Sequence, residues 1–396
     1  MSVAGRALAY ASIALEGLGL TRGRPLRGPL YAQIGISDVC DHRCVMCPYH
    51  PPGEADPGWM AGGRAAMMPP TELERLLEDL AALGTQRVDF VGRGEPLLHP
   101  SFVDVMRSAK RRGLFVSVTT NGSRLTTERA RAMIDAGLDA LRVSLNAGRR
   151  DTYGRIHVTE TADSYDAVCA RVATLTRMRR EAASRLPHVT LSFTISVRNH
   201  GELHDMIEVV AAVGADAASF QHVIPSAAGG PPLELDPNQH ARLVDELVPA
   251  ALDRARQLRV DTNLSSFAAT APPGSASDPV VPCHAGSYFT VVLGNGAILP
   301  CCQTKSAVGH VERGFRAVWR GERYAAFRRA ARALPASSPE LATCECDRCY
   351  FRPHNASIER MLHPWNASEG RGLIGVEQLL RMSRLDRDHP GGGRSR

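Results

Sequence analysis

Three cysteines, Cys40, Cys44 and Cys47, lie within eight residues of the chain. They follow an apolar segment, Tyr31 to Val39, that predicts a strand. Closed zinc sites and ordinary cubane iron–sulfur clusters both take four protein ligands. Three thiolates in a C-x3-C-x2-C pattern therefore predict a metal centre with one position open to another ligand. The alternative is that the thiols are close by chance.

A second polar segment, Gly92-Arg93-Gly94-Glu95-Pro96, follows a short predicted strand at Arg87 to Val91. Taken alone, it is also typical of an ordinary strand-to-helix turn. Polar residues end two later β-branched runs as well: Asn121 follows one, and Ser144 and Asn146 end the other. Barrel enzymes place their chemistry at such C-terminal strand ends.

Six segments predict strands, and helical periodicity lies between them. This alternation predicts a parallel sheet covered by helices, and six units fit an incomplete barrel better than the full eight. The sequence thus predicts an α/β fold with a partial TIM-like (β/α)6 barrel. The predicted strands are residues 31–39, 87–91, 114–119, 140–145, 189–197 and 217–223, and the predicted helices between them are residues 70–83, 102–112, 127–136, 165–180 and 202–213.

The triplet, the Gly94-Glu95 loop and this order of strands resemble the radical S-adenosylmethionine (SAM) superfamily. The resemblance implies that Cys40, Cys44 and Cys47 hold a [4Fe-4S] cluster whose open iron chelates SAM. One electron from the cluster then cleaves SAM to methionine and a 5'-deoxyadenosyl radical. It further implies that Gly94 and Glu95 receive the ammonium group of SAM, although Arg93 replaces the first glycine usual in this loop.

The same resemblance assigns other cofactor contacts. It implies that Asn121, Ser144 and Asn146 touch the ribose or the carboxylate of SAM. The segment Asp151 to His157 resembles one that usually ends in an arginine reaching that carboxylate, and here His157 holds this position. We therefore expect His157 to contact the cofactor, with a chemistry different from that of arginine.

Six of the ten cysteines lie between Cys283 and Cys349, around a predicted hairpin with a Gly294-Asn295-Gly296 turn. This region resembles the SPASM and shorter twitch extensions of radical SAM enzymes. The resemblance implies one auxiliary [4Fe-4S] cluster with four cysteine ligands, and Cys344 could replace one of them, Cys346. A structural zinc ribbon is the alternative. The implied ligands are Cys283, Cys301, Cys346 and Cys349.

The remaining thiols bear on the outcome of the reaction. If the auxiliary cluster accepts an electron from the substrate radical, an alcohol becomes a ketone. If a thiol returns a hydrogen atom from the other face, the product is an epimer. Cys302 is the preferred candidate because it adjoins Cys301, with Cys169 and Cys344 as further candidates. All three could also be buried structural thiols.

Composition divides the chain into five predicted parts. They are an N-terminal helical extension (1–30), the radical SAM partial barrel (31–225), a connector helix and linker (226–282), the small cysteine-rich auxiliary-cluster domain (283–355) and a C-terminal tail (356–396). No stretch of some twenty apolar residues is present, which argues against a membrane span. Cysteines suited to metal ligation indicate a reducing, cytoplasmic location.

The net charge of +6 is modest and almost entirely due to arginine, so solvated helix faces are favoured over nucleic-acid binding. The resemblance implies dehydrogenation or epimerisation of a small carbohydrate- or aminocyclitol-like molecule in a biosynthetic pathway, with an electron donor such as flavodoxin or ferredoxin. The first alternative is a maturase acting on a peptide or protein. Peptide-modifying relatives often carry a leader-binding domain ahead of the barrel, whereas 39 residues precede Cys40 here. The second alternative is a scaffold that binds metal without catalysis.

Overall fold

The computed structural model describes residues 19, 25–52, 66–223, 232–267, 280–346, 349 and 351–362. Most of the predicted N-terminal extension, part of the predicted linker before residue 280 and the tail beyond residue 362 lie outside the described residues. The boundaries of these parts therefore remain predictions. None of the described helices has the length and apolar character needed to cross a membrane.

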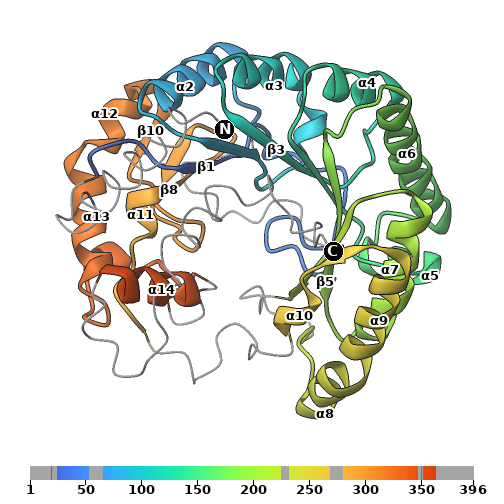
Figure 1. Ribbon diagram of the computed structural model, residues 1–396. Coiled ribbons are helices and arrows are strands. Elements are labelled where there is room, and N and C mark those ends of the chain that lie inside the picture. The colour runs from blue at the N-terminus through green and yellow to red at the C-terminus, as the bar shows by residue number, and fades with distance from the viewer. Residues whose placement is uncertain are drawn as a thin grey trace, which may run out of the picture.

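One sheet of ten strands forms the centre of the described structure, in the order β10-β9-β8-β1-β2-β3-β4-β5-β6-β7. Neighbouring strands from β8 and β1 through β7 pair in parallel, and Figure 1 shows the sheet curving into an open barrel. The strands are β1 (Tyr31–Ile34), β2 (Arg87–Phe90), β3 (Phe115–Thr120), β4 (Ala140–Ser144), β5 (His188–Ile195), β6 (Ala217–His222), β7 (Asp261–Thr262), β8 (Phe289–Val292), β9 (Ala297–Leu299) and β10 (Gly309–His310).

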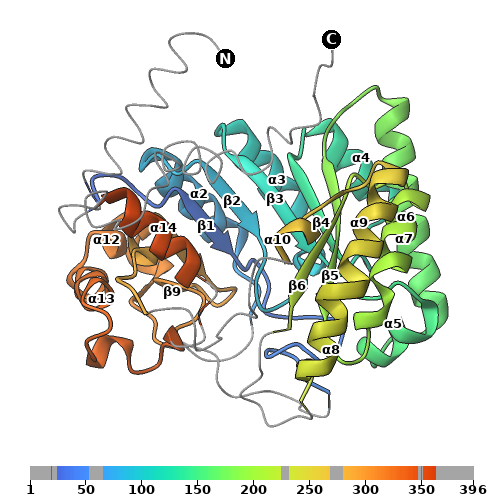
Figure 2. The same cartoon turned by 60° about the horizontal axis from the view of Figure 1, so that its bottom comes forward.

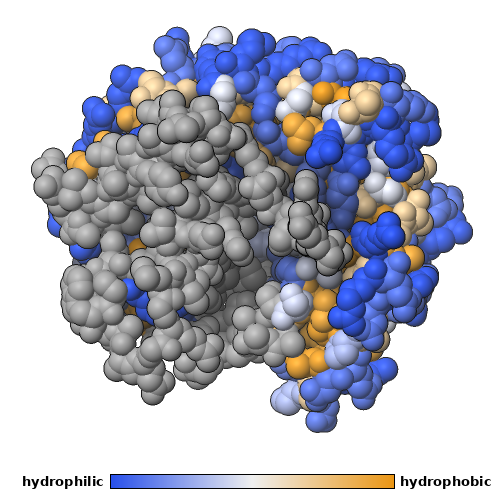
Figure 3. Space-filling model, in the orientation of Figure 1, coloured by the Kyte–Doolittle hydropathy of each residue, from blue (hydrophilic) through white to orange (hydrophobic). Residues whose placement is uncertain are grey.

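Helices cover the outside of this sheet (Figure 1). In the first of them, α2, leucines at positions 73, 76, 77 and 80 recur at helical spacing and are buried. The outer rim of the molecule is predominantly hydrophilic, as Figure 3 shows. The outer helices are α2 (Pro70–Ala82), α3 (Phe102–Arg111), α4 (Thr127–Asp135), α5 (Arg150–Ile156), α6 (Ala162–Glu181), α7 (Leu203–Ala212), α8 (Pro237–Arg242) and α9 (Val248–Leu258).

The two faces of β4 differ in polarity. Leu141 and Val143 are fully buried in the core between sheet and helices. The intervening Arg142 is exposed, and Ser144 is half-buried. Because side chains alternate along a strand, Arg142 and Ser144 point to the inner face of the barrel.

The predicted α/β partial barrel is confirmed, since strands and helices alternate from β1 to β6 as expected. Two strands extend it. The short β7, from the predicted connector, pairs with β6, and β8, from the cysteine-rich region, pairs with β1. Each extension supplies hydrogen-bond partners for what would otherwise be an open sheet edge. The cysteine-rich region is therefore continuous with the barrel sheet.

Two local predictions differ from the structure. The first strand ends at Ile34 rather than Val39, because the backbone at Ile36 and Asp38 hydrogen bonds to Met68 and Ala66 instead of to β2. Residues 150–156 form the helix α5, which the sequence did not predict. With seven residues, this helix is too short to show a clear apolar period.

The C-terminal elements form a second apolar cluster beside β1. Phe289 and Val291 of β8 pack there with Phe327 of α13. Figure 2 shows these elements grouped on one side of the barrel, and α7 to α9 at the opposite edge. The helices here are α11 (Ala285–Tyr288), α12 (Phe315–Trp319), α13 (Glu322–Arg332) and α14 (Arg352–Leu362), and α10 (Leu264–Phe267) lies near the far edge.

Candidate active site and metal centres

The loop with the cysteine triplet leaves the carboxyl end of β1. Backbone hydrogen bonds hold it on two sides: the amide of Val45 donates to the carbonyl of Ile156 (2.9 Å), and the amide of Glu95 donates to the carbonyl of Val39 (2.8 Å). The triplet is thereby fixed at the end of the barrel where such folds place their functional groups.

Backbone amides point at two of the three sulfur atoms. The amide of His42 donates to the Sγ of Cys40 (3.5 Å), and the amides of Tyr49 and His50 each donate to the Sγ of Cys47 (3.4 Å). Burial nevertheless raises the pKa of Cys40 to about 12 and also raises the pKa of Cys47. Thiolates at these positions therefore require a bound cation to offset their charge.

The spacing of the possible ligand atoms bears on which metal the cysteine loop could hold. Sulfur ligands about 2.3 Å from one tetrahedral zinc ion lie about 3.8 Å apart. Within the described residues, one group of three possible ligands has all its ligand atoms within 4.8 Å of one another, namely His42, Cys44 and His157. The three sulfur atoms of the triplet do not all lie within 4.8 Å of one another, which argues against one zinc ion bound by all three. The tight group shares Cys44 with the triplet, so the two sites cannot be filled together.

Gly94 lies against the backbone of the cysteine loop. A Cβ at this position would lie 2.3 Å from the carbonyl oxygen of Val39 and 2.6 Å from that of Ser37. Only glycine permits this approach.

Glu95 is buried, and both of its carboxylate oxygens accept hydrogen bonds. Oε1 accepts from the Leu97 amide (2.9 Å) and the Thr120 hydroxyl (2.6 Å), and Oε2 accepts from the Asn121 amide (2.7 Å). Burial raises the pKa of Glu95 to about 7 despite these donors. The carboxylate therefore joins the ends of β2 and β3, two neighbouring parallel strands.

Arg93, in place of the usual glycine, turns towards the C-terminal end of the cysteine loop. Its guanidinium lies 5.5 Å from the ring centre of Tyr49 and hydrogen bonds to the Tyr49 side chain. It also lies near the carboxylate of Asp38, whose charge opposes the effect of burial on the pKa of Arg93. Arg93 thus places a buried cation next to the cysteine loop.

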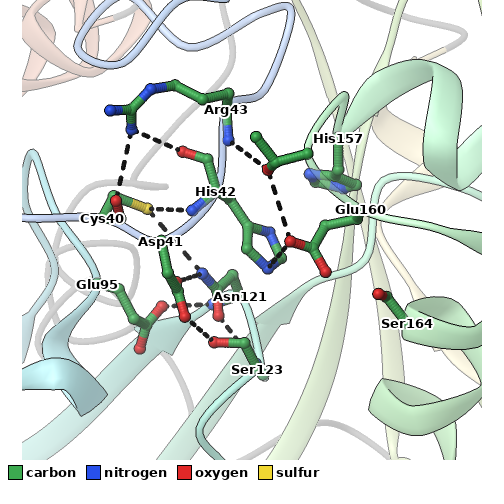
Figure 4. A network of polar contacts seen from close by, with 12 residues as sticks. Cys40, Asp41, His42, Arg43, Glu95, Asn121, Ser123, His157, Glu160 and Ser164 are labelled. Atoms are coloured by element: carbon green, nitrogen blue, oxygen red, sulfur yellow. Dashed lines mark hydrogen bonds and ion pairs between the residues drawn. The ribbon is translucent and has the colours of Figure 1, made fainter. Parts of the chain in front are cut away.

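Asp41 organises the polar residues beside Cys40, and the sequence reasoning missed it (Figure 4). Its carboxylate accepts from the side chains of Asn121 (2.8 Å), Ser123 (2.8 Å) and Arg124 (3.3 Å). Burial opposes ionisation of Asp41, but the hydrogen bonds from Asn121 and Ser123 lower its pKa overall. The amide of Asn121 also lies 4.0 Å from the Sγ of Cys40. An acidic residue between two cysteines was the available signal.

His157 contacts the triplet itself. Its Nδ1 lies 3.0 Å from the Sγ of Cys44, and its Nε2 lies 3.1 Å from the carbonyl oxygen of Leu145. Burial lowers the pKa of His157 to about 4, so the ring is neutral. His42 is also buried, with Nε2 3.6 Å from the carboxylate of Glu160.

Ser144 and Asn146 lie at the end of β4 but differ in their surroundings. Ser144 is half-buried and is paired in register with Ser192 of β5. Asn146 has a positive φ of 57°, and its Oδ1 accepts from the amide of Thr194 (3.0 Å). The Asn146 side chain therefore secures the backbone of β5.

The cysteine-rich region encloses a cavity lined by five thiols: Cys283, Cys301, Cys344, Cys346 and Cys349. The structure thus brings together the four predicted ligands and one predicted alternative. The Nδ2 of Asn355, on α14, donates to the Sγ of Cys283 (3.3 Å), a contact that the sequence did not reveal. Burial raises the pKa of Cys283 to about 12, so these thiols too require a cation to ionise.

The other two thiols lie elsewhere. Cys302 is not among the residues that line the cavity, although it packs against the apolar cluster that contains Cys301. After burial, its charge contributes to the raised pKa of Tyr288, as the charges of cavity thiols do, and to the raised pKa of Tyr49 on the cysteine loop. Cys169 is on α6 in the outer layer, where it hydrogen bonds to Tyr165.

A buried carboxylate joins the two metal regions. The Oδ1 of Asp38, two residues before Cys40, accepts from the amide of Gly294 in the turn between β8 and β9 (3.2 Å). The carbonyl of Asp38 contacts the Nε2 of His50 on the same loop (2.9 Å). The cysteine loop and the C-terminal hairpin are thus fixed relative to each other.

Two family models match the chain. The model of the radical SAM superfamily matches residues 34–208, and that of the SPASM iron–sulfur cluster-binding domain matches residues 283–350. These matches contain the triplet and the five cavity cysteines, respectively.

Curated relatives match part of the barrel. A probable GTP 3',8-cyclase of Thermococcus kodakarensis is 32% identical over 48% of this chain and 55% of its own length. A GTP 3',8-cyclase of Aeromonas hydrophila is 40% identical over 30% of this chain and 34% of its own length. A protein of Pyrococcus furiosus named as modifying the cofactor of a tungsten-containing aldehyde ferredoxin oxidoreductase is 25% identical over 49% of this chain and 52% of its own length. The chain thus spans about half or less of these relatives.

Solved structures share the fold over most of the chain. Streptococcus suis SuiB bound to S-adenosylmethionine has a TM-score of 0.58 at 17% identity, covering 84% of this chain and 74% of SuiB. The enzyme anSMEcpe with bound AdoMet has a TM-score of 0.57 at 13% identity, covering 90% of this chain and all of that one. These structures show the shared fold. The two domain matches identify residues 34–208 as a radical SAM domain, which binds a [4Fe-4S] cluster with SAM, and residues 283–350 as a SPASM domain, which binds auxiliary iron–sulfur clusters.

Proposed function

We propose that this enzyme uses SAM radical chemistry to dehydrogenate or epimerise a small, hydroxylated, carbohydrate-like molecule that carries an anionic group. The observation that carries the proposal is the polarity of the inner face of the barrel. The names of the GTP 3',8-cyclases, which match about half or less of their length, are consistent with a small anionic substrate.

Hydroxyl groups form a row across the inner face. Ser144 of β4, Ser192 of β5 and Ser219 of β6 are paired in register on adjacent strands. The Ser192 hydroxyl is buried and has no hydrogen-bond partner among the described residues. A buried hydroxyl without a partner is costly, so a polar ligand that hydrogen bonds to it would be favoured.

A guanidinium lies one layer deeper on the same face. Arg142 of β4 is exposed between Thr119 of β3 and Thr190 of β5. Among the described residues, no hydrogen bond or ion pair engages it. Two residues of strand separate Arg142 from Ser144, a distance of about 7 Å. A substrate with one sugar-sized ring could therefore reach both the serine row and Arg142, which would bind a carboxylate or phosphate group.

When bound, the cluster with SAM supplies one-electron cleavage of SAM and, from it, removal of a hydrogen atom from the substrate. The protein's part is to hold the reactants and exclude water. Cys40, Cys44 and Cys47 would hold this cluster, with Asn121 and Asp41 beside Cys40. Gly94, Glu95 and His157 would shape the cofactor site by fixing the cysteine loop and the strand ends around it.

One auxiliary [4Fe-4S] cluster would be held by Cys283, Cys301, Cys346 and Cys349. Dehydrogenation of an alcohol requires loss of a hydrogen atom, one electron and the hydroxyl proton, and the auxiliary cluster would supply the electron acceptor. Epimerisation would need a thiol that returns a hydrogen atom and is then restored by one electron and one proton from the external electron donor and solvent. Cys302 is the favoured thiol because it adjoins Cys301. A flavodoxin or ferredoxin would reduce the first cluster.

A peptide substrate is the second candidate, because SuiB, which shares the fold, has also been solved with its precursor peptide SuiA. Anaerobic assays with SAM and dithionite, run in deuterated solvent on panels of sugar acids, sugar phosphates, aminocyclitols and short peptides, separate the candidates. We expect 5'-deoxyadenosine release to be coupled to oxidation of a small acidic substrate or to deuterium incorporation into it. Turnover of peptides alone would reject the proposal.

Arg142 provides a sharper test of the substrate class. Arg142→Gln should raise KM for an acidic substrate by roughly 10- to 100-fold, as expected for loss of about 1.5–3 kcal/mol from one charged hydrogen bond. The same substitution should leave KM unchanged for an analogue of the substrate that lacks the anionic group. Arg177→Gln, on the exposed surface of α6, is the matched control. Equal effects on both substrates would show that Arg142 does not bind the anion.

A further inference from the structure

The compact group of possible metal ligands beside the cysteine triplet has a geometry of its own. One ligand atom each from His42, Cys44 and His157 lie within 4.8 Å of one another. The two histidines are only 2% and 1% exposed. The assignment of the triplet to a cluster gives neither imidazole a metal to bind. The group therefore indicates a second use of Cys44.

The backbone holds Cys44 and His157 side by side. The two residues form an antiparallel β-bridge, and backbone hydrogen bonds of 2.9 and 3.0 Å join their neighbours on either side. Residues paired in this way lie closer together than a pair that exchanges its own hydrogen bonds. The Sγ of Cys44 accordingly lies 3.0 Å from the Nδ1 of His157.

The far nitrogen of His157 sets the direction of the ring. Nε2 lies 3.1 Å from the carbonyl oxygen of Leu145. Because a carbonyl oxygen only accepts, Nε2 donates this hydrogen bond and carries the proton of the neutral ring. Nδ1 then directs its lone pair towards Cys44. Histidines that bind metal are commonly oriented by such a hydrogen bond from the other nitrogen to a backbone carbonyl.

His42 completes the group and lies beside a negative charge (Figure 4). Neither of its ring nitrogens has a hydrogen-bond partner among the described residues, and Nε2 lies 3.6 Å from the carboxylate of Glu160. The rings of His42 and His157 meet edge-on, with 5.4 Å between their centres. A buried polar atom without a partner is costly, so a metal ion that takes a nitrogen of His42 as ligand would be favoured. The Cys44 thiolate and Glu160 together would offset the charge of a divalent cation.

The chemistry of these donors fits zinc. Thiolate, imidazole and carboxylate are all zinc ligands, whereas magnesium and calcium take oxygen ligands. Sulfur and nitrogen atoms bound to one tetrahedral zinc ion lie about 3.5 Å apart. The Cys44 and His157 atoms, now 3.0 Å apart, would have to separate by about half an ångström to admit the ion. A small rotation of either side chain is enough for this.

We propose that, when the barrel cluster is absent, Cys44, His42 and His157 bind one Zn²⁺ with Glu160 beside it, and that zinc bound there blocks assembly of the cluster. Binding releases the proton of the Cys44 thiol to solvent. Cys44 cannot be a ligand to zinc and to the cluster together, so the metal that occupies it decides whether SAM can bind. The blocking step rests on the cluster ligands of the proposed function, whereas zinc binding does not.

Zinc binding is tested in full-length protein with Cys40→Ala and Cys47→Ala, which cannot hold the barrel cluster. Anaerobic reconstitution should first fill the auxiliary site with about four iron atoms per chain. After addition of Zn²⁺ and desalting, we expect about one zinc ion per chain, and zinc-edge X-ray absorption should show one sulfur ligand among nitrogen and oxygen ligands. Unchanged auxiliary iron would show that each variant is folded and that its cluster is intact.

Further substitutions in this double variant locate the zinc. Adding His42→Ala or Cys44→Ala should remove it. His204→Ala, which changes a half-exposed histidine on α7, is the matched control and should keep it. Absence of zinc from the double variant would overturn the inference. Zinc that persists in Cys44→Ala, or that several sulfur atoms bind, would also overturn it, because the ion would then lie elsewhere.

Blocking is tested by adding Zn²⁺ before reconstitution of wild type and His42→Ala. The readout is the electron paramagnetic resonance signal that responds to SAM, relative to the same protein without zinc. We expect a severalfold loss in wild type and a smaller one in His42→Ala. Equal losses would overturn the blocking step. If the triplet held no cluster, this signal would be missing without zinc as well, while zinc binding in the double variant would be unaffected.

Discussion

Within the cysteine loop, Cys44 is held by a close contact with His157. Its sulfur faces the ring of His157 at 3.0 Å, and burial together with Cys47 and Cys40 raises its pKa well above the usual value. Such a thiol ionises when a metal binds. If it is one of three cluster ligands, Cys40 and Cys47 cannot take over its role, because each already binds the cluster.

Cys44→Ser should therefore abolish the barrel cluster. We expect the iron content after anaerobic reconstitution to fall by about half, from roughly eight to roughly four atoms per chain, and 5'-deoxyadenosine formation to stop. Cys169→Ser is the matched control, since it removes a half-buried thiol from the outer layer. Full iron content in Cys44→Ser would show that the triplet is not the ligand set.

We expect the Glu95 carboxylate to contribute to the free energy of unfolding as well as to the cofactor loop. Glu95→Ala would leave the Leu97 and Asn121 amides and the Thr120 hydroxyl without their acceptor. At about 1–3 kcal/mol for each unsatisfied buried donor, the free energy of unfolding should fall by several kcal/mol. Urea unfolding of the metal-free protein measures this. Thr120→Val removes the hydroxyl that donates to Glu95 and accepts from the Gly122 amide, and should cost about 1–3 kcal/mol, less than Glu95→Ala. Equal midpoints for Glu95→Ala and wild type would refute the assignment.

At the level of elements, the strand ends and the cysteine loop approach each other through glycines. In Gly94→Ala, the new Cβ would overlap the backbone of the cysteine loop, 2.3 Å from the Val39 carbonyl oxygen. Backbone cannot move aside as a flexible side chain can, so the loop should shift and assembly of the barrel cluster should fail.

The matched control is Gly201→Ala, at a position where an added Cβ meets nothing within 4 Å. We expect iron content and SAM binding to fall severalfold in Gly94→Ala and to match wild type in Gly201→Ala. Iron analysis and equilibrium dialysis with labelled SAM provide the measurement. Equal cluster content in the two variants would mean that the loop tolerates displacement.

At the level of the whole molecule, the SPASM region extends the barrel sheet beyond β1. Strand β8 pairs with all four residues of β1, and the tilted rings of Tyr31 and Phe289 lie 5.1 Å apart across this junction. Asp38 adds its hydrogen bond to Gly294. The strand that leads into the cysteine triplet is therefore supported by the C-terminal part of the chain.

A chain ending at residue 280 should consequently lose both metal centres. The edge of β1 would be left without partners, and an open edge promotes aggregation. We expect little soluble protein and no barrel cluster, measured as soluble yield and iron per chain. Co-expression of residues 281–396 should restore part of the yield. A soluble truncated barrel with four iron atoms would show that the two parts assemble independently.

The sequence by itself determined the alternation of strands and helices and the two cysteine groups, because periodicity, turn residues and ligand spacing are local properties. It did not reveal the contacts of Asp41 and Asn355, whose partners Asn121 and Cys283 lie 80 and 72 positions away. Nor could it show that β8 joins β1, since strand pairing over such separations depends on which edges remain open once the barrel forms. The tertiary structure decided which of the neighbouring thiols line one cavity and which face of β4 is covered by helices, because both depend on how distant segments of the chain pack together.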